Sequence, residues 1–226
     1  MPYVSEKYEF IYMASPATGS SATLAAFDKW DMGKLYPENP VRDEDGRIVY
    51  SAKHGDYENF VALGLMKPEW KEYVRICGIR NPFSFHLNQY ERAKYRLKQI
   101  DDPNSHFAKM SEAQREEKRV MFGNIVGKTF KDYLMQKFKN SKESFLHKKY
   151  VVNADYHIRQ ECLNEDLLKL KDIISLPDGF DVEVKGVTVG GPNNREKYVN
   201  YYDEELVDFV YKLNKPFFEL FPEYEF

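Results

Sequence analysis

The stretch Phe10-Ile-Tyr-Met-Ala-Ser-Pro-Ala-Thr-Gly-Ser-Ser-Ala-Thr-Leu24 decides the fold that this sequence predicts. An apolar run breaks into small hydroxyl residues around Gly19 and then continues with residues that favour a helix. This order is typical of a strand, a tight turn and a helix. The N–H groups at such a helix start, with the hydroxyls of Thr18, Ser20 and Ser21, can bind a phosphate or sulfate group. The same pattern also fits an ordinary strand-to-helix connection capped by Ser or Thr.

The composition indicates one folded domain over residues 1–226, since 42% of the residues are hydrophobic and 15% are aromatic. A formal net charge of −3 argues against a dedicated nucleic-acid binder. Cys77 and Cys162 lack the spacing of a disulfide framework or a metal site, and both are expected to be free and buried. The apolar stretch near the N-terminus is too short for a signal peptide or a membrane span, which predicts a cytoplasmic protein with no membrane partner.

Apolar strands alternate with helical segments along the chain. Strands are expected at residues 8–14, 47–51, 73–79 and 150–158, and helices at 21–30, 58–66, 83–99, 111–139 and 167–174. Ser111 and Gln114 have the spacing of a capping box, and Asn164 is the expected cap of the 167–174 helix. The alternation predicts an α/β fold with three layers, in which helices flank a mostly parallel sheet. Because ligands bind beyond the carboxyl ends of parallel strands, the Gly19 turn and Arg80 are expected at one edge.

Four segments resemble in order the sulfotransferase family that uses 3′-phosphoadenosine 5′-phosphosulfate. They lie at residues 15–22, 74–90 and 155–167 and, for the closing helix and aromatic tail, at 201–207 with 218–226. The resemblance is to the branch that acts on carbohydrate hydroxyls. It implies a fold similar to the P-loop-containing nucleotide-binding folds and a nucleotide donor with phosphate at two ends. Such a donor needs two separated anion sites, one at a helix N-terminus and one around a guanidinium.

The resemblance also implies roles for individual residues. Thr18, Gly19, Ser20 and Ser21 match the loop that binds the 5′-phosphosulfate. Arg80 matches the arginine that binds the 3′-phosphate, and Asn88 stands where the family has a serine with the same role. Phe85 replaces a second family arginine. In residues 190–198, Arg195, Lys197 and Tyr198 resemble a loop that covers the donor, although a solvated loop fits that segment equally well.

Two further positions bear on catalysis. Sulfuryl transfer to an alcohol needs a base, and His54-Gly55 resembles the histidine-glycine element of hexuronic-acid 2-O-sulfotransferases. The other histidines rank below His54. Ala17 stands where the family usually has a loop lysine that neutralises charge on the transferring group. Either another cation enters the site, for which the sequence offers Lys53, Arg195 and Lys197, or the protein is slow or inactive.

The resemblance therefore implies sulfuryl transfer to a hydroxyl of a small molecule or glycan, without a metal. The alternative is a catalytically degenerate nucleotide- or glycan-binding protein on the same scaffold, which Ala17 and Phe85 favour. A kinase is disfavoured, because residues 8–28 contain no lysine and the loop lacks the Lys-Ser/Thr pair of nucleotide triphosphatases.

Overall fold

The computed structural model describes residues 2–50, 54–141, 144–181 and 198–226. These residues divide into two compact units. The first unit contains the described residues of 1–80 and 147–188, and the second contains those of 81–146 and 189–226. The single domain expected over residues 1–226 stays a prediction.

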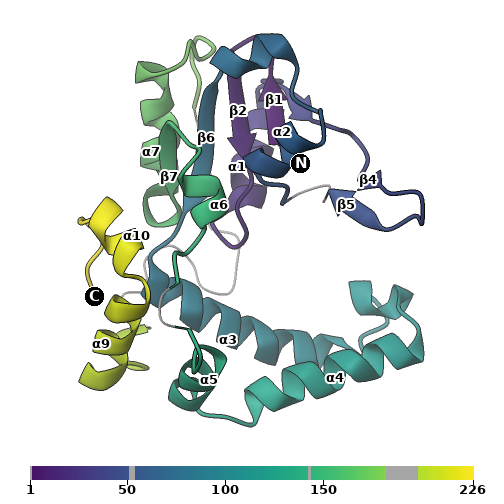
Figure 1. The fold of residues 1–226 in the computed structure, drawn as a ribbon, viewed down its shortest axis with the longest axis vertical. Helices are drawn as coiled ribbons and strands as arrows, with labels where there is room; N and C mark the ends of the chain where they lie inside the picture. Colours follow the sequence, from purple (N-terminus) through teal and green to yellow (C-terminus); the bar gives the residue numbers. More distant parts are fainter. Residues whose placement is uncertain (1, 51–53, 142–143, 182–197) are drawn as a thin grey trace. The chain divides into compact units, whose positions relative to one another are not determined.

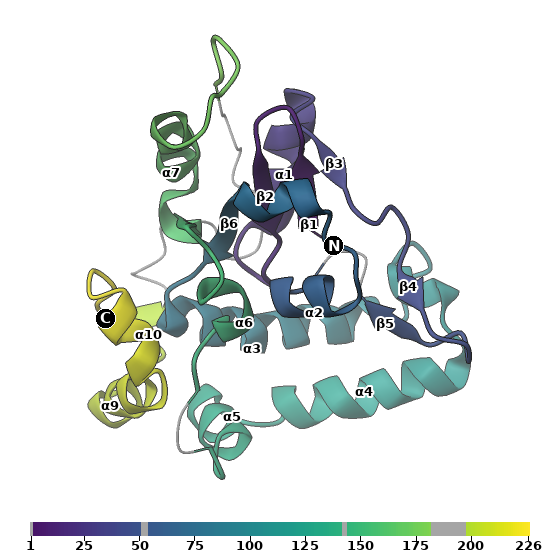
Figure 2. The ribbon, with the colours of Figure 1, turned by 45° about the horizontal axis from the view of Figure 1, so that its top comes forward.

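The first unit is built on a five-stranded mixed sheet in the order β3-β1-β2-β6-β7 (Figure 1). The strands are β1 (Pro2–Ser5), β2 (Phe10–Met13), β3 (Lys34–Leu35), β6 (Val74–Ile79) and β7 (Tyr156–Arg159). β2 pairs in parallel with β6, and β6 pairs in parallel with β7. β1 runs antiparallel to both β2 and β3. β3 is labelled in Figure 2. A separate antiparallel pair joins β4 (Val41–Arg42) to β5 (Ile48–Tyr50).

Helices flank this sheet. α1 (Ser20–Lys29) and α7 (Leu163–Lys169) share one core with the strand residues Phe10, Tyr12 and Ile76. On the opposite side, α6 (Lys148–Val151) contacts β6, and α2 (Tyr57–Ala62) contacts α6. The described residues of this unit also form the short 3-10 helices η1 (Pro68–Glu72), η3 (Gln160–Cys162) and η4 (Leu170–Asp172). The first unit is therefore a layered α/β structure.

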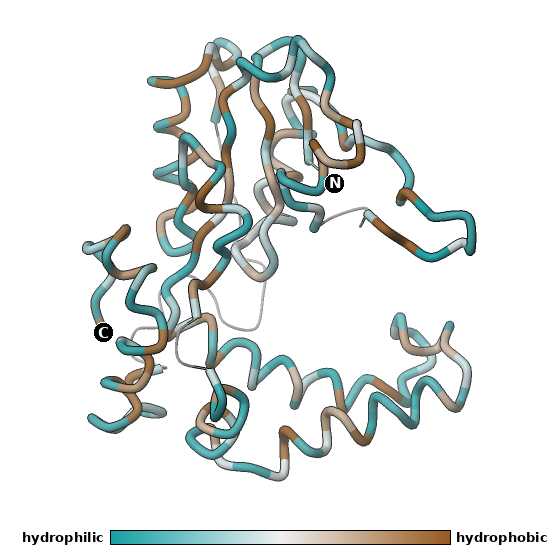
Figure 3. Tube along the Cα trace, viewed as in Figure 1, coloured by the Kyte–Doolittle hydropathy of each residue, from teal (hydrophilic) through white to brown (hydrophobic). Residues whose placement is uncertain are grey.

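An aromatic cluster holds α1 against the sheet. The Phe27 ring is fully buried, and its centroid lies 5.5 Å from that of Tyr3, 5.1 Å from Phe10 and 5.5 Å from Tyr12. These three rings lie on one face of the sheet, because Tyr3 pairs with Tyr12 across β1 and β2 and Phe10 is two residues before Tyr12 on β2. In contrast, β5 carries exposed Ile48 and Val49 and appears brown beside the hydrophilic β4–β5 turn (Figure 3).

The second unit is helical. Its helices are α3 (Pro82–Gln99), η2 (His106–Lys109), α4 (Glu112–Val126), α5 (Phe130–Lys137), α9 (Glu204–Leu213) and α10 (Lys215–Leu220). α3 packs against α4, α5 and α9. Its first turn is fixed by Pro82 and by the Asn81 side chain, which accepts a hydrogen bond from the Phe83 N–H. Phe83 is buried in an aromatic cluster with Tyr202, Tyr211, Phe218 and Phe226.

The α/β class and the helix-flanked sheet are confirmed, but the sheet is mixed. β1, which no sequence pattern predicted, pairs antiparallel with β2 and β3 and makes the sheet mixed. The Ser111–Gln114 capping box is also confirmed. The charged middle segment forms two helices, because Gly127 ends α4 and the Thr129 side chain caps α5. No helix within the described part of the chain is long and apolar enough to cross a membrane.

Three local expectations are wrong. Residues 150–158 do not form one strand, because the backbone closes a helical turn at Lys148–Val151 and becomes extended only at Tyr156. Asn164 does not cap its helix, because η3 leads directly into α7 and places Cys162 at the N-cap. Cys162 is half-buried, whereas Cys77 is buried as expected.

Replacement of Phe27 by alanine tests the aromatic cluster. We expect F27A to lower the free energy of unfolding by about 3–5 kcal/mol, because it removes a buried ring and leaves a cavity. The control is V61A on α2, where the side chain is 46% exposed and a change within about 0.5 kcal/mol is expected. Urea unfolding measures both, and a loss below about 1 kcal/mol in F27A would contradict this account of the core.

Candidate functional site

The parallel pairing of β2 with β6 brings the Gly19 turn and Arg80 to one edge of the sheet. Met13 lies opposite Cys77 in the register, so the chain leaves both strands at the same edge. Arg80 is only 7% exposed, and its Nη1 donates a hydrogen bond to the Ala17 carbonyl at 3.2 Å. The expected meeting of the two segments is therefore present in the first unit.

The turn has the backbone conformation of an anion-binding loop. Gly19 is the N-cap residue of α1 and lies in the left-handed region, with φ of +78°. Among the described residues, no side chain caps this helix start. A left-handed residue followed by a helical one points successive N–H groups into a concavity that suits an anion, and Ser20 and Ser21 lie in the first helical turn. Glycine is needed here because of its φ, and the nearest neighbours leave ordinary van der Waals space.

Thr18 has a structural role within the turn. Its side chain is fully buried, and its hydroxyl donates to the Ser15 carbonyl at 2.9 Å. The Ser15 hydroxyl in turn donates to the Gly78 carbonyl of β6. A Cβ on Gly78 would overlap the Thr18 hydroxyl and lie 2.9 Å from the Thr18 Cβ. The turn is therefore locked against β6, and Thr18 directs its hydroxyl into the protein.

His54 lies at the same edge as the turn. Its Nδ1 lies 2.7 Å from the carbonyl oxygen of Ala14, which directly follows β2. Because a carbonyl only accepts hydrogen bonds, Nδ1 must carry the proton, and the neutral ring then has its lone pair on Nε2. This tautomer is the one that a general base acting through Nε2 requires.

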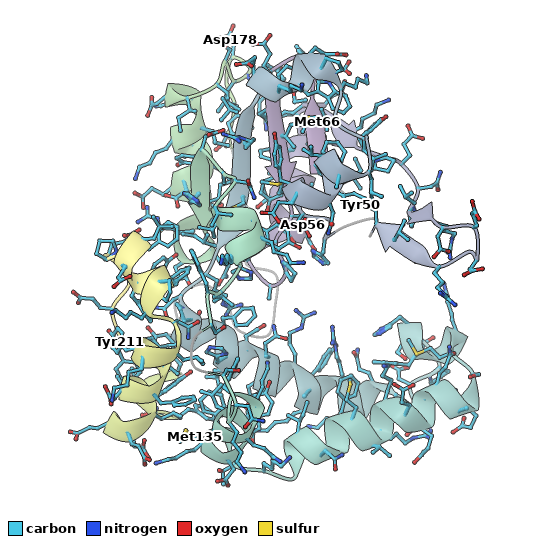
Figure 4. The ribbon with its side chains drawn as sticks, in the orientation of Figure 1. Tyr50, Asp56, Met66, Met135, Asp178 and Tyr211 are labelled. Carbon is cyan, nitrogen blue, oxygen red and sulfur yellow. The ribbon has the colours of Figure 1, made fainter. Side chains whose placement is uncertain are left out.

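Three neighbours hold the backbone around His54. The Tyr150 hydroxyl donates to the His54 carbonyl at 2.6 Å, and burial together with nearby Asp56 raises the pKa of Tyr150 to about 12, so the hydroxyl stays protonated. Tyr50 donates to the Asp56 carbonyl at 3.3 Å, and both residues are labelled in Figure 4. The Asp56 carboxylate caps α2 by accepting from the Asn59 N–H at 2.9 Å. Sequence patterns miss Tyr150, because nothing in the sequence couples it to a residue 96 positions earlier.

His147 lies near Arg80 but contributes no positive charge to this edge at neutral pH. Burial, together with the Arg80 guanidinium, lowers the pKa of His147 to about 3. The His147 backbone is left-handed, with φ of +60°, and forms the N-cap of α6. Lys149 of α6 has its Nζ 3.7 Å from the Asp56 carboxylate. Among the described residues, Arg80 is the cation that contacts the turn.

The carboxyl end of β7 brings further residues to the Gly19 turn that no sequence motif indicated. A Cβ placed on Gly19 would lie 3.4 Å from Leu163 and 3.5 Å from Gln160, so both side chains border the turn. Arg159 makes a two-pronged ion pair with buried Asp166, with Nε to Oδ2 at 2.8 Å and Nη2 to Oδ1 at 2.6 Å. Gln160 directly follows a third parallel strand, and this position could have indicated it as a site residue from the sequence.

Several expected site residues belong to other parts of the chain. Asn88 lies on α3 in the second unit. Tyr198 also belongs to that unit, where its buried ring stacks on Phe83 at a centroid distance of 6.4 Å. Lys53, Arg195 and Lys197 lie outside the described residues.

Three histidines that rank below His54 as the candidate base make other contacts. His86 is buried and its Nε2 lies 3.4 Å from Asn214 Nδ2, while His106 begins η2. The His157 Nε2 lies 3.2 Å from the Val151 carbonyl on the edge strand β7. Within the described ranges, no three His, Cys, Asp or Glu side chains gather as a metal-binding group.

Comparisons with protein-family models, with curated proteins and with solved structures gave no match.

Replacement of Gly78 by alanine tests how closely the turn packs on β6. We expect G78A to lower the free energy of unfolding by about 1–3 kcal/mol, because the new methyl group forces Thr18 out of its place. The control is G123A on α4, where a Cβ meets no atom within 4 Å and helix propensity favours alanine by up to about 1 kcal/mol. Thermal unfolding of both variants gives the comparison. A G78A protein as stable as the unchanged chain would show that Thr18 is not held against this strand.

Proposed function

We propose that this protein transfers a sulfuryl group from 3′-phosphoadenosine 5′-phosphosulfate to an acceptor hydroxyl, on a small molecule or a glycan. The observation that supports it best is the hydrogen bond from Arg80 to the Ala17 carbonyl. This contact joins a buried guanidinium to a left-handed glycine turn at the carboxyl ends of two parallel strands. A nucleotide with phosphate at both ends of its sugar needs this combination of groups.

The residues present suit the donor in two respects. The first turn of α1 offers N–H groups and the Ser20 and Ser21 side chains to the 5′-phosphosulfate, and its dipole favours negative charge. The planar guanidinium of Arg80 carries five N–H donors in a fork whose geometry matches the oxygens of a phosphate, and one of them holds the Ala17 carbonyl. In this proposal the hydroxyl of Thr18 supports the turn, and its N–H takes part in binding.

In the proposed reaction, the acceptor oxygen attacks sulfur in line with the bond to the 5′-phosphate oxygen. The new O–S bond forms as that bond breaks, and 3′-phosphoadenosine 5′-phosphate leaves with the electron pair. His54 takes the acceptor proton on Nε2, since its Nδ1 proton is committed to the Ala14 carbonyl. Tyr150 holds the His54 backbone in this orientation and is a positioning residue. The helix start and Arg80 stabilise the charge on the leaving phosphate.

The second candidate function is nucleotide or glycan binding without transfer. Ala17 favours it, because the side chain at this position cannot place a cation against the transferring group. The two functions share the donor site and differ in turnover. A donor that binds without yielding sulfated product, over a broad panel of hydroxyl acceptors, would favour the binding protein.

Calorimetric titration with 3′-phosphoadenosine 5′-phosphate tests the donor site. We expect R80Q to weaken binding about 10- to 100-fold, because hydrogen bonds to a charged group contribute about 1.5–3 kcal/mol and 1.4 kcal/mol corresponds to a factor of ten. The matched control is R75Q at the other end of β6, where the arginine pairs with Asp155 at 2.6 Å and binding should stay within about twofold. Equal losses in R80Q and R75Q, or no binding by the unchanged chain, would contradict the proposed site.

A transfer assay over a panel of sugar hydroxyls tests the role of His54. We expect H54A to lower turnover by about 10²- to 10⁴-fold, because general-base catalysis typically contributes that much, with donor affinity retained. The control is H106A in the second unit, which should leave turnover and affinity unchanged. Unchanged turnover in H54A would remove this histidine from the chemistry.

A further inference from the structure

Helix α3 carries an unusual concentration of positive charge. Within Pro82–Gln99 the only acidic residue is Glu91, against Arg92, Lys94, Arg96 and Lys98. Glu91 pairs with Lys94 at 2.9 Å, so the one carboxylate of the helix is already engaged. Arg92 and Arg96 are four residues apart and therefore lie on one side of the helix, separated by a rise of about 6 Å.

The two arginines lie beside the packed face of α3. The buried residues Phe83, Leu87, Tyr90 and Ala93 define that face, and Ala93 shares a core cluster with Phe122 of α4. At 3.6 residues per turn, Arg92 lies nearly opposite Tyr90, and Arg96 lies at the border of the packed face. There the Arg96 guanidinium carbon stands 6.0 Å from the centroid of the buried Phe122 ring, close enough for a cation–π contact. Both arginine side chains are half-buried.

Neither arginine pairs with a carboxylate in the part of the chain that the structure describes. Their neighbours on α4 behave differently, since Arg115 pairs with Glu112, and Arg119 pairs with Asp101 at 2.6 Å. Burial and the nearby charge of Arg92 lower the pKa of Arg96. Two like charges are therefore held close together and partly out of water, an arrangement that an anion between them would relieve.

We propose that Arg92 and Arg96 form a binding site for a tetrahedral oxyanion, the phosphate or sulfate group of a ligand. A tetrahedral phosphate or sulfate presents oxygens in several directions, so two guanidinium forks can bind different edges of it, whereas a planar carboxylate presents a single edge. Asn88, one helical turn before Arg92, places a side-chain amide on the same side of α3. This site lies within the second unit and does not depend on the function proposed for the first.

Arginine side-chain NMR of the full chain tests the site, with inorganic phosphate and inorganic sulfate as probes and acetate as the planar comparison at equal ionic strength. We expect the Nε–H signals of Arg92 and Arg96 to shift together and saturate with phosphate and with sulfate, at least tenfold more tightly than with acetate. The signal of Arg75, which is paired with Asp155, serves as the internal control and should not move. Equal responses to acetate, or equal shifts at Arg75, would reduce the effect to general ionic attraction and overturn the proposal.

Variants separate this site from the donor site. R92Q should raise the dissociation constant seen at Arg96 at least tenfold, whereas K98Q, an exposed cation of the same helix, should change it less than twofold. R92K keeps the charge and the fold but removes the fork, and should also weaken binding. R80Q should leave the α3 signals unchanged while nucleotide binding falls. An Arg96 response that survives R92Q and R92K, or that disappears in R80Q, would overturn the proposal.

The origin of the oxyanion follows from the same titration with glucose 6-phosphate and glucose 6-sulfate. Tighter binding of an ester than of the free ion supports a phosphorylated or sulfated ligand at this site. Equal binding of ester and ion supports the site as one for the free anion.

Discussion

The register between β2 and β6 is the constraint on which the candidate site depends. Ile76 of β6 lies opposite Tyr12 and shares its core, and the same register places Met13 opposite Cys77 at the end of both strands. A slip of one residue would turn Ile76 to the other face of the sheet, away from the core cluster that it shares with Tyr12, so packing fixes the pairing. The pairing in turn fixes where the chain leaves each strand. The contact between Arg80 and Ala17 is therefore a consequence of how Tyr12 and Ile76 pack in the core of the sheet.

The elements that the sequence predicted correctly are those with local signals. β2 and β6 are apolar runs that end at small residues or at Arg80-Asn81-Pro82, and the capping box at Ser111 depends on residues three positions apart. The errors occur where packing overrides a local preference. Tyr150 and Val151 belong to an apolar run that favours a strand, yet both are buried in a helical turn against β6. β1 has no distinctive pattern, and its antiparallel pairing with β2 and β3 makes the sheet mixed.

The position of the candidate site at one edge of the sheet was predictable from the sequence. The contacts that hold its residues in place were not. Parallel strands share a carboxyl edge, which was enough to bring the Gly19 turn and Arg80 together from the sequence. No periodicity links His54 to Ala14 or Tyr150, or Gly19 to Gln160, since these residues come from separate parts of the chain. Thr18 illustrates a different limit. Its hydroxyl suits an anion in the sequence, but the close approach of Gly78 lets it point inward.

Ala17 is the residue on which the choice between the two candidate functions depends. The geometry of the turn shows which property of this residue matters. The Arg80 bond is to the Ala17 carbonyl, which any residue at this position would supply. The left-handed conformation of Ala17, with φ of +63°, is no easier for alanine than for lysine, because both carry a Cβ. Neither the turn nor its contact with β6 therefore requires alanine here. What the residue at position 17 changes is the charge of the turn, because alanine is neutral where a lysine would add a cation. His147 is neutral beside Arg80, and the proposal already assigns the Arg80 guanidinium to the donor.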